Sequence, residues 1–369
     1  MLGIGLRDCY LTPENDYHIL EPVPNWHSPL HVMTTTIRDV AKKAGVGLGT
    51  VSRVLNNSSL VSEETRQRVQ EAIRQLDYVP NPTARRLSLG KTLTITVVVP
   101  WFTRPAEVER LRGIEHTLSE SEYDLILYNV ETPRQRDVAF GHVLRRELTD
   151  GVLIIALSPR DDDISRLAQS SVPVVLIDAN HESLTALNRV IVDDVAGGCL
   201  ATQHLIDLGH QRIGYISDPL ETVMNFTSSR YRYQGYRQAL EAAAIPFYPD
   251  DHGQGEHGRY EARRLANLML ARSDRPTAIF AASDTQALGV IEAAQDNELR
   301  VPDDLSVIGY DDIELAEYAG LTTIRQMLYE SGKRGVELLL DKLADPATEP
   351  VCEVMPTELI IRKTTAPPR

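Results

Sequence analysis

Cysteines and long apolar runs are both scarce in this sequence of 369 residues. Its three cysteines, Cys9, Cys199 and Cys352, lie far apart and show none of the paired spacings typical of a disulfide framework or a zinc site. No apolar run approaches the roughly 18 residues that a membrane-spanning helix needs, and residues 1–32 lack the features of a secretory signal. These absences predict a cytoplasmic protein with reduced thiols and no membrane partner.

Motifs that carry chemistry are scarce too. The GxxxxGKS/T phosphate loop is absent, and we expect neither nucleotide hydrolysis nor dinucleotide chemistry. Candidate metal ligands such as His204, His210, Asp193 and Asp194 have no further ligands clustered around them, so we interpret them as ordinary residues of helix and turn surfaces. We therefore predict no enzyme activity, no cofactor and no bound metal.

The net charge of −14 hides an uneven distribution along the chain. Residues 33–91 contain ten Lys and Arg but only five acidic residues, a net charge of +5, whereas residues 92–369 carry −16. A basic segment attached to an acidic body is typical of a protein that attracts phosphates on one face only. The length fits a small domain joined to a larger, bipartite domain.

Residues 1–32 show no helical or strand period and contain several prolines, so they are predicted to be a disordered extension. The ordered pattern starts at Met33, which we take as the hypothetical true start of translation. The domains expected after it are a DNA-binding domain at 33–80, a hinge at 81–91 and a two-lobed domain at 92–369.

Three short apolar stripes at helical spacing follow Met33. The first predicts a helix over 36–44, capped by Thr36 and ended by Gly45 in a left-handed conformation. The third predicts a helix over 63–76. The inward-facing residues of the second, intervening helix are Val51, Val54 and Leu55. A helix, a glycine turn and a helix at this spacing form the helix-turn-helix layout.

The outward face of the second helix carries hydrogen-bonding side chains and no acidic residue. Thr50, Ser52, Arg53 and Asn56 suit contacts with base edges and phosphates. The apolar stripes alone would also fit a small three-helix domain that does not bind DNA. The polar outward face of the second helix favours a DNA-binding domain.

The run TIRDVAKKAGVGLGTVSRVLNNSSLVSEETRQRVQEAIRQLDYVPNPTARRL, residues 36–87, resembles the N-terminal segment of the lactose/galactose repressor family. The resemblance implies that the second helix enters the major groove of operator DNA. It also implies that residues 81–91 become a helix on DNA and that Leu87 wedges between base pairs in the minor groove. The positions that it places against DNA are Thr36, Leu48, Gly49, Thr50, Ser52, Arg53, Asn56, Asn81, Ala84 and Leu87.

Two glycines depart from the family pattern. Gly47 stands where the family usually has serine, and Gly49 occupies one of two variable positions that set sequence specificity. Because Gly49 offers no side chain to a base, discrimination there falls to Leu48, to water or to DNA shape.

Beyond residue 92, apolar runs alternate with amphipathic helical stretches, which predicts an α/β fold with parallel sheets covered on both faces. The predicted strands span 95–100, 124–130, 151–157, 172–178, 189–194, 212–217, 278–283, 305–310 and 357–363. Segments such as SSRYRYQGYRQAL and VPDDLSVIGYDD resemble the same repressor family and the periplasmic sugar-binding proteins. This resemblance implies two parallel-sheet lobes joined by three crossing strands, with ligand in the cleft between them.

By the same resemblance, Arg232 and Asp311 match the ligand-contacting arginine and aspartate of the family, and Ser283 occupies a further contact position. Asp178 and Asp193 are secondary candidates, and Asp284 suits lobe or dimer contacts instead. A guanidinium and a carboxylate together satisfy vicinal hydroxyls or a polar ring edge. Where many relatives have a stacking aromatic residue, this chain has Gln254; the candidates for a replacement stacking face are Trp101 and Phe102.

These observations predict a homodimeric transcriptional repressor whose partners are operator DNA and a small-molecule effector. A saccharide is the expected effector, with a purine or another metabolite as the alternative. A solute-binding protein of a transporter shares the two-lobed body, but it needs an export signal and no DNA-binding domain. A homodimer is expected because the chain ends without the leucine heptads that some relatives use to form tetramers.

Overall fold

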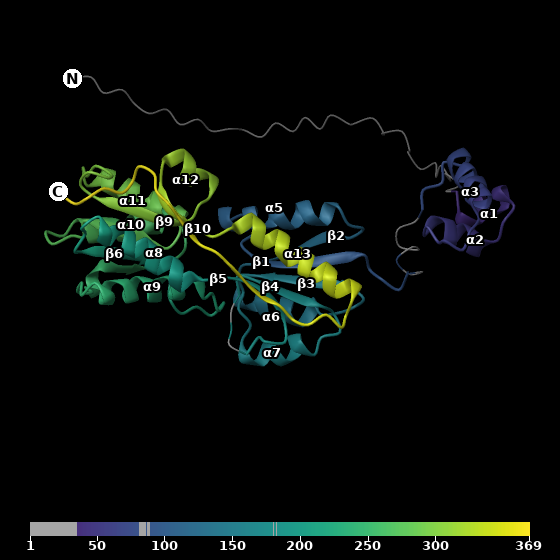
Figure 1. The fold of residues 1–369 in the computed structure, drawn as a ribbon, viewed down its shortest axis with the longest axis horizontal. Helices are drawn as coiled ribbons and strands as arrows, with labels where there is room; N and C mark the ends of the chain where they lie inside the picture. The colour runs from purple at the N-terminus through teal and green to yellow at the C-terminus, as the bar shows by residue number, and fades with distance from the viewer. Residues whose placement is uncertain (1–34, 81–85, 87–88, 180, 182) are drawn as a thin grey trace, which may run out of the picture. The chain divides into compact units, whose positions relative to one another are not determined.

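The computed structural model describes residues 35–80, 86, 89–179, 181 and 183–369. These residues form two compact units that divide after residue 82, and each is described here by itself (Figure 1). The predicted extension at 1–32 and the hinge positions Asn81, Ala84 and Leu87 lie outside the described residues.

The first unit contains three helices, α1 (Ile37–Ala44), α2 (Leu48–Leu55) and α3 (Glu63–Gln75), which confirms the predicted pattern. Their apolar stripes meet in one small core, in which Val40, Val51 and Val69 are fully buried. Helix α1 ends at Gly45 in the predicted left-handed conformation, with φ of 65°. The inward face of α2 therefore packs in this core, and the opposite face of α2 is exposed.

The second unit contains two six-stranded sheets, each with helices on both faces. The first has the order β11 (Cys352–Met355), β5 (Asn188–Val192), β4 (Val174–Ile177), β3 (Gly151–Ile155), β1 (Thr94–Pro100), β2 (Asp124–Val130). The second has the order β12 (Glu358–Ile360), β10 (Thr322–Arg325), β9 (Ser306–Asp311), β8 (Ala278–Ala281), β6 (Ile213–Ser217), β7 (His252–Gln254). We call the sheets with their covering helices the first lobe and the second lobe.

The chain passes between the lobes three times, after β5, after β10 and after β11. The expected two lobes with three crossings are therefore present. All strand pairs are parallel except β10 with β12, where Ile324 lies opposite Leu359. Because parallel strands end at the same edge, loops that follow β1, β4, β6, β8 and β9 can supply side chains to one region.

Three strands were not predicted from the sequence: β7, β10 and β11. Each is three or four residues long. Their sequences HGQ, TTIR and CEVM contain no sustained apolar run. Pairing with a neighbouring strand, rather than local pattern, makes them strands.

Alternation along the strands builds a core on each side of each sheet. In the first lobe, Val97 and Val99 of β1 pack with α5 (Pro105–Ser119) and α13 (Leu328–Ala344). Val98 packs on the other face with α6 (Pro133–His142) and α7 (Asp161–Ala168), which Figure 1 shows on the side opposite α5. Both faces of the first sheet are therefore buried, as the continuous apolar strands predict.

The second lobe follows the same plan. Tyr215 of β6 packs with α8 (Asp194–Asp207) and α9 (Ser228–Ala242), and Ile216 packs on the opposite face. The remaining helices of the lobe are α10 (Arg259–Leu270), α11 (Asp284–Asp296), α12 (Glu314–Ala319) and the short 3-10 helix η1 (Pro249–Asp251). Across the described part of the chain, no helix is long and apolar enough to span a membrane.

Helices α5 and α13 approach each other at two glycines. A Cβ atom on Gly113 would lie 2.0 Å from the backbone oxygen of Tyr329, and one on Gly332 would lie 2.1 Å from that of Arg110. Because backbone atoms cannot give way as a flexible side chain can, the two helices need glycine at both positions. This contact fixes the position of α5.

We predict that Gly113→Ala lowers the free energy of unfolding by about 1–3 kcal/mol, because the added methyl group forces α5 away from α13. Gly141, within α6, is the matched control, since nothing lies within 4 Å of a Cβ built there. Gly141→Ala is expected to leave stability unchanged or to raise it by up to about 1 kcal/mol. Urea denaturation followed by circular dichroism measures both, and equal effects of the two substitutions would contradict the packing argument.

Candidate functional site

A narrow cleft lies between the two lobes, at the carboxyl ends of their strands. It is lined mainly by polar and charged groups rather than by the apolar surface common in small-molecule pockets. The first lobe contributes the charged residues Arg104, Glu107, Arg110 and Asp178 and several small apolar ones. The second lobe contributes, among others, Asp218, Ser229, Arg232, His257, Ser283, Gln286 and Asp311. Such a lining suits a polar ligand.

Arg232, on α9, is buried at the centre of the cleft. Its Nε donates to Asp194 Oδ1 at 2.8 Å, and its Nη1 donates to the backbone oxygen of Ala282 at 2.7 Å and lies 3.6 Å from Asp311 Oδ1. The guanidinium carbon lies 3.8 Å from the centroid of the Tyr310 ring. The guanidinium is therefore held on several sides before any ligand arrives.

Asp311 ends β9 with φ of 116°, a conformation that residues other than glycine rarely adopt. Asp178, directly after β4, has φ of 54°. Strained backbone of this kind is retained where the surrounding structure holds it, and it is enriched at binding sites. In both residues the strained loop turns a carboxylate toward the cleft.

Arg110, on α5, is the first lobe's counterpart of Arg232. Its Nη2 donates to Asp178 Oδ2 at 2.6 Å and to Gln326 Oε1 at 3.1 Å. The Nε2 of Gln326 in turn donates to Asp311 Oδ1. A continuous set of hydrogen bonds and ion pairs therefore runs from Asp178 in the first lobe to Arg232 in the second, and we call it the lobe-bridging network.

Burial dominates the electrostatics of this network. It raises the pKa of Asp194 to about 6 and the pKa of Asp311 above its usual value, in both cases against the attraction of Arg232. Burial also acts to lower the pKa of Arg232, but Asp194 and Asp311 outweigh it and hold that pKa well above its ordinary range. The arginine is therefore charged at neutral pH.

A second connection between the lobes comes from residues 223–226, which follow β6 and which we call the latch. Met224 is buried in a core cluster of the first lobe. Asn225 Nδ2 donates to the backbone oxygen of Ser158 at 3.0 Å, and Arg160 Nη2 donates to that of Val223 at 2.6 Å. Phe226 lines the cleft. The latch therefore holds the lobes together beside the ligand site.

The structure brings four of the predicted effector residues together in the cleft lining: Asp178, Arg232, Ser283 and Asp311. Ser283 also caps α11, where its hydroxyl accepts the backbone N–H of Gln286. The other secondary candidate, Asp193, and the residue expected at lobe or dimer contacts, Asp284, are hydrogen-bonded within the second lobe. Asp193 caps α8, and Asp284 accepts from the Thr323 hydroxyl and the Ile313 backbone N–H.

Three predicted stacking or contact residues lie outside the cleft lining. Trp101 lies in a neighbouring hollow, with its ring centroid 5.5 Å from that of Phe226. Phe102 is exposed, and Gln254, also exposed, accepts the backbone N–H of Leu220 through its amide oxygen. The aromatic side chain that does line the cleft is Phe226, which the sequence did not single out.

Sequence reasoning also missed the charged residues on the first turns of α5. Glu107 and Arg110 stand three residues apart, a spacing that in a sequence reads as an ordinary exposed ion pair. Both are buried in the structure. Their burial depends on the α5–α13 contact and on the second lobe, neither of which leaves a local signal.

The expectation of no dinucleotide chemistry has one apparent exception in the sequence. The motif GxGxxG, which is typical of dinucleotide-binding loops, occurs at residues 253–258, between β7 and α10. Its middle glycine, Gly255, lies against the carboxylate of Glu261, since a Cβ there would be 2.4 Å from Glu261 Oε1. A phosphate would meet that negative charge, so the motif carries no dinucleotide site.

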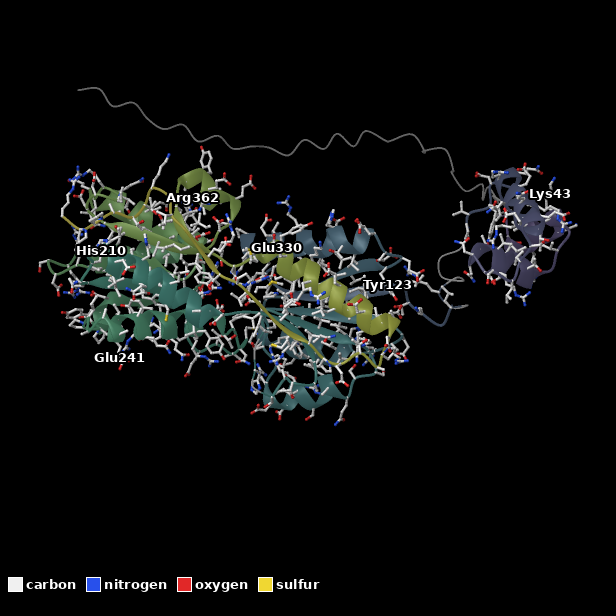
Figure 2. The ribbon with its side chains drawn as sticks, in the orientation of Figure 1. Lys43, Tyr123, His210, Glu241, Glu330 and Arg362 are labelled. Atoms are coloured by element: carbon white, nitrogen blue, oxygen red, sulfur yellow. The ribbon has the colours of Figure 1, made fainter. Side chains whose placement is uncertain are left out.

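The histidines proposed as ordinary surface residues have protein partners. His210, labelled in Figure 2, contacts the Thr277 hydroxyl at 2.8 Å and the Ala366 backbone oxygen at 3.0 Å. His204 contacts the Thr365 hydroxyl. Within the described residues, no three His, Cys, Asp or Glu side chains gather as a metal site would require.

In the first unit, α2 presents the predicted contact residues on its solvent side. Leu48 is 45% exposed, and Gly49, Arg53 and Asn56 are exposed beside the half-buried Thr50 and Ser52. No described carboxylate pairs with the Arg53 guanidinium. Nothing lies within 4 Å of a Cβ built on Gly49, so packing does not require glycine there.

Thr36 is the exception among the predicted contacts. Its backbone N–H and its hydroxyl both donate to Asp39 Oδ2, at 2.9 and 2.7 Å, which lowers the pKa of Asp39. Thr36 therefore has a structural role at the start of α1. Figure 2 shows the side chains of this unit, with Lys43 labelled at the end of α1.

A helix-turn-helix unit followed by a two-lobed α/β unit with a polar cleft defines a DNA-binding transcriptional regulator with a small-molecule domain. Comparison with known families agrees. Residues 36–81 match the family described as "Bacterial regulatory proteins, lacI family", and residues 202–365 match the "Periplasmic binding protein-like domain".

Full-length relatives extend these matches. The chain is 34% identical over 336 residues to the "HTH-type transcriptional repressor PurR" of Haemophilus influenzae (strain PittEE), with 89% of this chain and 98% of the relative covered. It is 30% identical to a lac repressor dimer solved with operator and the anti-inducer ONPF, with a TM-score of 0.79 over 90% of this chain and 99% of that one. The chain belongs to the lacI family of bacterial regulatory proteins, as its motifs predict.

A further solved relative is a transcriptional regulator, CelR, in complex with cellobiose. It is 32% identical to this chain, with a TM-score of 0.66 and coverage of 89% of this chain and 99% of that one.

The latch gives a test of how the lobes are joined. Met224→Ala is expected to lower the free energy of unfolding of the second unit by about 2–5 kcal/mol, because it removes a buried side chain from the core of the first lobe. Val223→Ala is the matched control: its side chain is 69% exposed and its backbone contact with Arg160 is kept. That control should change stability by less than about 0.5 kcal/mol. Calorimetry that found no difference between the two variants would contradict the latch.

Proposed function

We propose that this protein is a repressor whose affinity for operator DNA is set by a small polyhydroxylated effector bound in the cleft. The lobe-bridging network is the observation that carries the proposal. A ligand that inserts between Asp178, Arg232 and Asp311 must compete with contacts that join the two lobes. Its binding therefore changes the relative stability of lobe arrangements, and by linkage DNA and effector influence each other equally.

A saccharide is the effector class that this lining favours. Carboxylates and arginines at fixed positions can accept from and donate to neighbouring hydroxyls. Phe226 offers an apolar ring beside them. The related regulator CelR has been solved in complex with cellobiose, a saccharide, and this supports a saccharide as the effector of the present protein. A purine remains the alternative, in which the same arginine and aspartate would contact a polar ring edge.

On the DNA side, we propose that α2 reads the operator through Arg53, Asn56, Thr50 and Ser52, with Leu48 supplying an apolar contact. The hinge residues Asn81, Ala84 and Leu87 are proposed to contribute in the minor groove. Because Gly49 provides no side chain, phosphate contacts and DNA shape would carry a large share of recognition.

A homodimer is the proposed assembly. Ile126 and Leu127 are exposed apolar residues on β2, the outer strand of the first sheet. An edge strand with exposed apolar side chains is a surface that proteins usually cover. The dimeric state of the related lac repressor supports the proposal, which is also the arrangement needed to place two DNA-binding units on one operator.

Arg53→Ala is expected to weaken binding to an operator duplex selected in vitro by about 10- to 100-fold, because one guanidinium contact with a base or phosphate is lost. The melting temperature of the free protein should stay the same, since Arg53 is exposed. Arg74→Ala, on α3 and paired with Glu71, is the control and should bind normally. Fluorescence anisotropy gives the affinities; a normal affinity for Arg53→Ala would remove Arg53 from the interface.

Arg232→Ala is expected to abolish the response to effector and leave operator binding by the effector-free protein largely intact. Ligands that bind the folded protein raise its melting temperature, so mono- and disaccharides are screened beside nucleobases by thermal shift. Arg230→Ala changes an exposed arginine on the same helix and should respond like the wild type. Because Arg232 is buried, Arg232→Lys provides a second variant that retains the charge. A normal response from both variants would refute the cleft assignment.

A further inference from the structure

The basic side chains that line the cleft have carboxylate partners, with one exception. Arg110 is paired with Asp178, Arg232 with Asp194 and His257 with Asp218. The fourth basic side chain, Arg104, has no described carboxylate within 4.0 Å. In a chain with 52 acidic and 38 basic residues, this lack of a partner is informative: a carboxylate would stabilise the guanidinium there.

Arg104 is held in place without its hydrogen-bond donors being used. Its guanidinium carbon lies 4.0 Å from the centroid of the Trp101 ring. A stacked guanidinium keeps its N–H donors in the plane of the group, free for an acceptor at its edge. The side chain lines both the cleft and the neighbouring hollow that contains Trp101 and Phe226. Its charge is therefore held at the ligand site, and no described residue uses its N–H donors.

Burial has a cost for this group. It lowers the pKa of Arg104, with the more distant Asp218 and Glu107 opposing the effect. The lowered pKa means that the charged form is poorly solvated where it stands. A ligand that brought only hydroxyls would leave that charge without a counter-charge when the site is filled.

Two neighbouring polar atoms are also without hydrogen-bond partners among the described residues. They are Glu107 Oε2 and Arg110 Nε; Glu107 is 7% exposed and Arg110 is 1% exposed. Both residues line the cleft beside Arg104, on the first turns of α5. Buried polar atoms without partners are rare in folded proteins, and a ligand or water normally satisfies them. Glu107 Oε2, which lies 3.6 Å from Arg110 Nη1, can still accept from a hydroxyl, and Arg110 Nε can donate to one, so this end of the cleft suits a polar ligand.

We infer that the effector is an anionic polyol, with a carboxylate or a phosphate that pairs with Arg104 and hydroxyls that contact the rest of the cleft. The inference rests on the proposed function and adds the charge of the ligand. A guanidinium binds either anion through two parallel N–H···O bonds, so a sugar acid and a sugar phosphate share the required chemistry. The N-terminus of α5, directly after Arg104, adds a partial positive charge.

The experiment compares neutral sugars with their own acids and phosphates. Glucose is measured beside glucuronate, gluconate and glucose 6-phosphate, and galactose beside galacturonate and galactonate, all at one ionic strength. Isothermal titration calorimetry gives affinities for the full-length wild type, for Arg104→Gln and for Arg112→Gln. Arg112 is the matched control because it is an exposed arginine on α5 that pairs with Glu109.

At least one anionic member should bind more tightly than its neutral parent. Arg104→Gln should weaken that anion by about 10- to 100-fold, because a charged hydrogen-bonded pair is lost, and should weaken the neutral parent by a much smaller factor. Arg112→Gln should leave both unchanged. Comparison of the sugar acids with the sugar phosphate shows whether Arg104 binds a carboxylate or a phosphate.

The free protein gives a second readout. If Arg104 had only a structural role, Arg104→Gln would lower the melting temperature of the ligand-free protein. We expect that melting temperature to stay the same or to rise, because the guanidinium charge of Arg104 has no carboxylate partner. Should Arg104→Gln fail to fold, Arg104→Lys, which keeps the charge, is expected to retain a preference for the anion.

Other outcomes separate this inference from the proposed function. If the neutral parent binds as tightly as its acids, or if Arg104→Gln binds the anion normally, the anionic ligand is refuted while effector control stands. If no anionic member binds the wild type, the inference is likewise overturned. The proposed function itself fails if no saccharide, neutral or anionic, changes operator affinity; a nucleobase that does so would support the purine alternative.

Discussion

A guanidinium removed from water must be surrounded by acceptors, and this requirement organises the second unit. Arg110 and Arg232 are both buried, and their acceptors come from different places in the chain: Asp178 after β4, Asp311 at the end of β9, and Gln326 at a crossing between the lobes. Removing one partner of a buried ion pair costs about 3–5 kcal/mol, because the other charge remains. The lobes can therefore separate only if these charges find other partners, such as water or a ligand.

Packing brings these charges to their positions. The glycines at the contact between α5 and α13 let the helix that carries Arg110 lie close to α13. Gly198 and Gly235 do the same for α8 and α9, since a Cβ on Gly198 would lie 2.2 Å from the backbone oxygen of Arg232. The latch adds an apolar anchor through Met224. The polar and apolar connections lie side by side, so a ligand in the cleft affects both.

The parts of the fold that were predictable are those with a local signal. The three helices of the first unit follow from periodicity and the nine predicted strands from apolar runs, and Arg232 and Asp311 follow from family resemblance. Strands β7, β10 and β11 could not be found because pairing alone defines them. Glu107 and Arg110 look like a surface ion pair until α13 and the second lobe bury them. Phe226 and Gln326 lie in segments that connect helices and strands, where the sequence carries little information about which way a side chain points.

Within the two proposed binding surfaces, the unpaired arginines are as informative as the paired ones. In an acidic chain, a carboxylate partner is readily available, and the buried arginines Arg110, Arg136 and Arg232 each have one. Several exposed arginines, such as Arg230 and Arg237, also lack a described carboxylate partner, but Arg53 and Arg104 lack one on surfaces for which we propose a ligand. An arginine used to bind a phosphate or carboxylate from outside must not be neutralised from inside, because an internal ion pair would compete with the ligand. The same physical rule thus links the DNA-facing helix and the effector cleft.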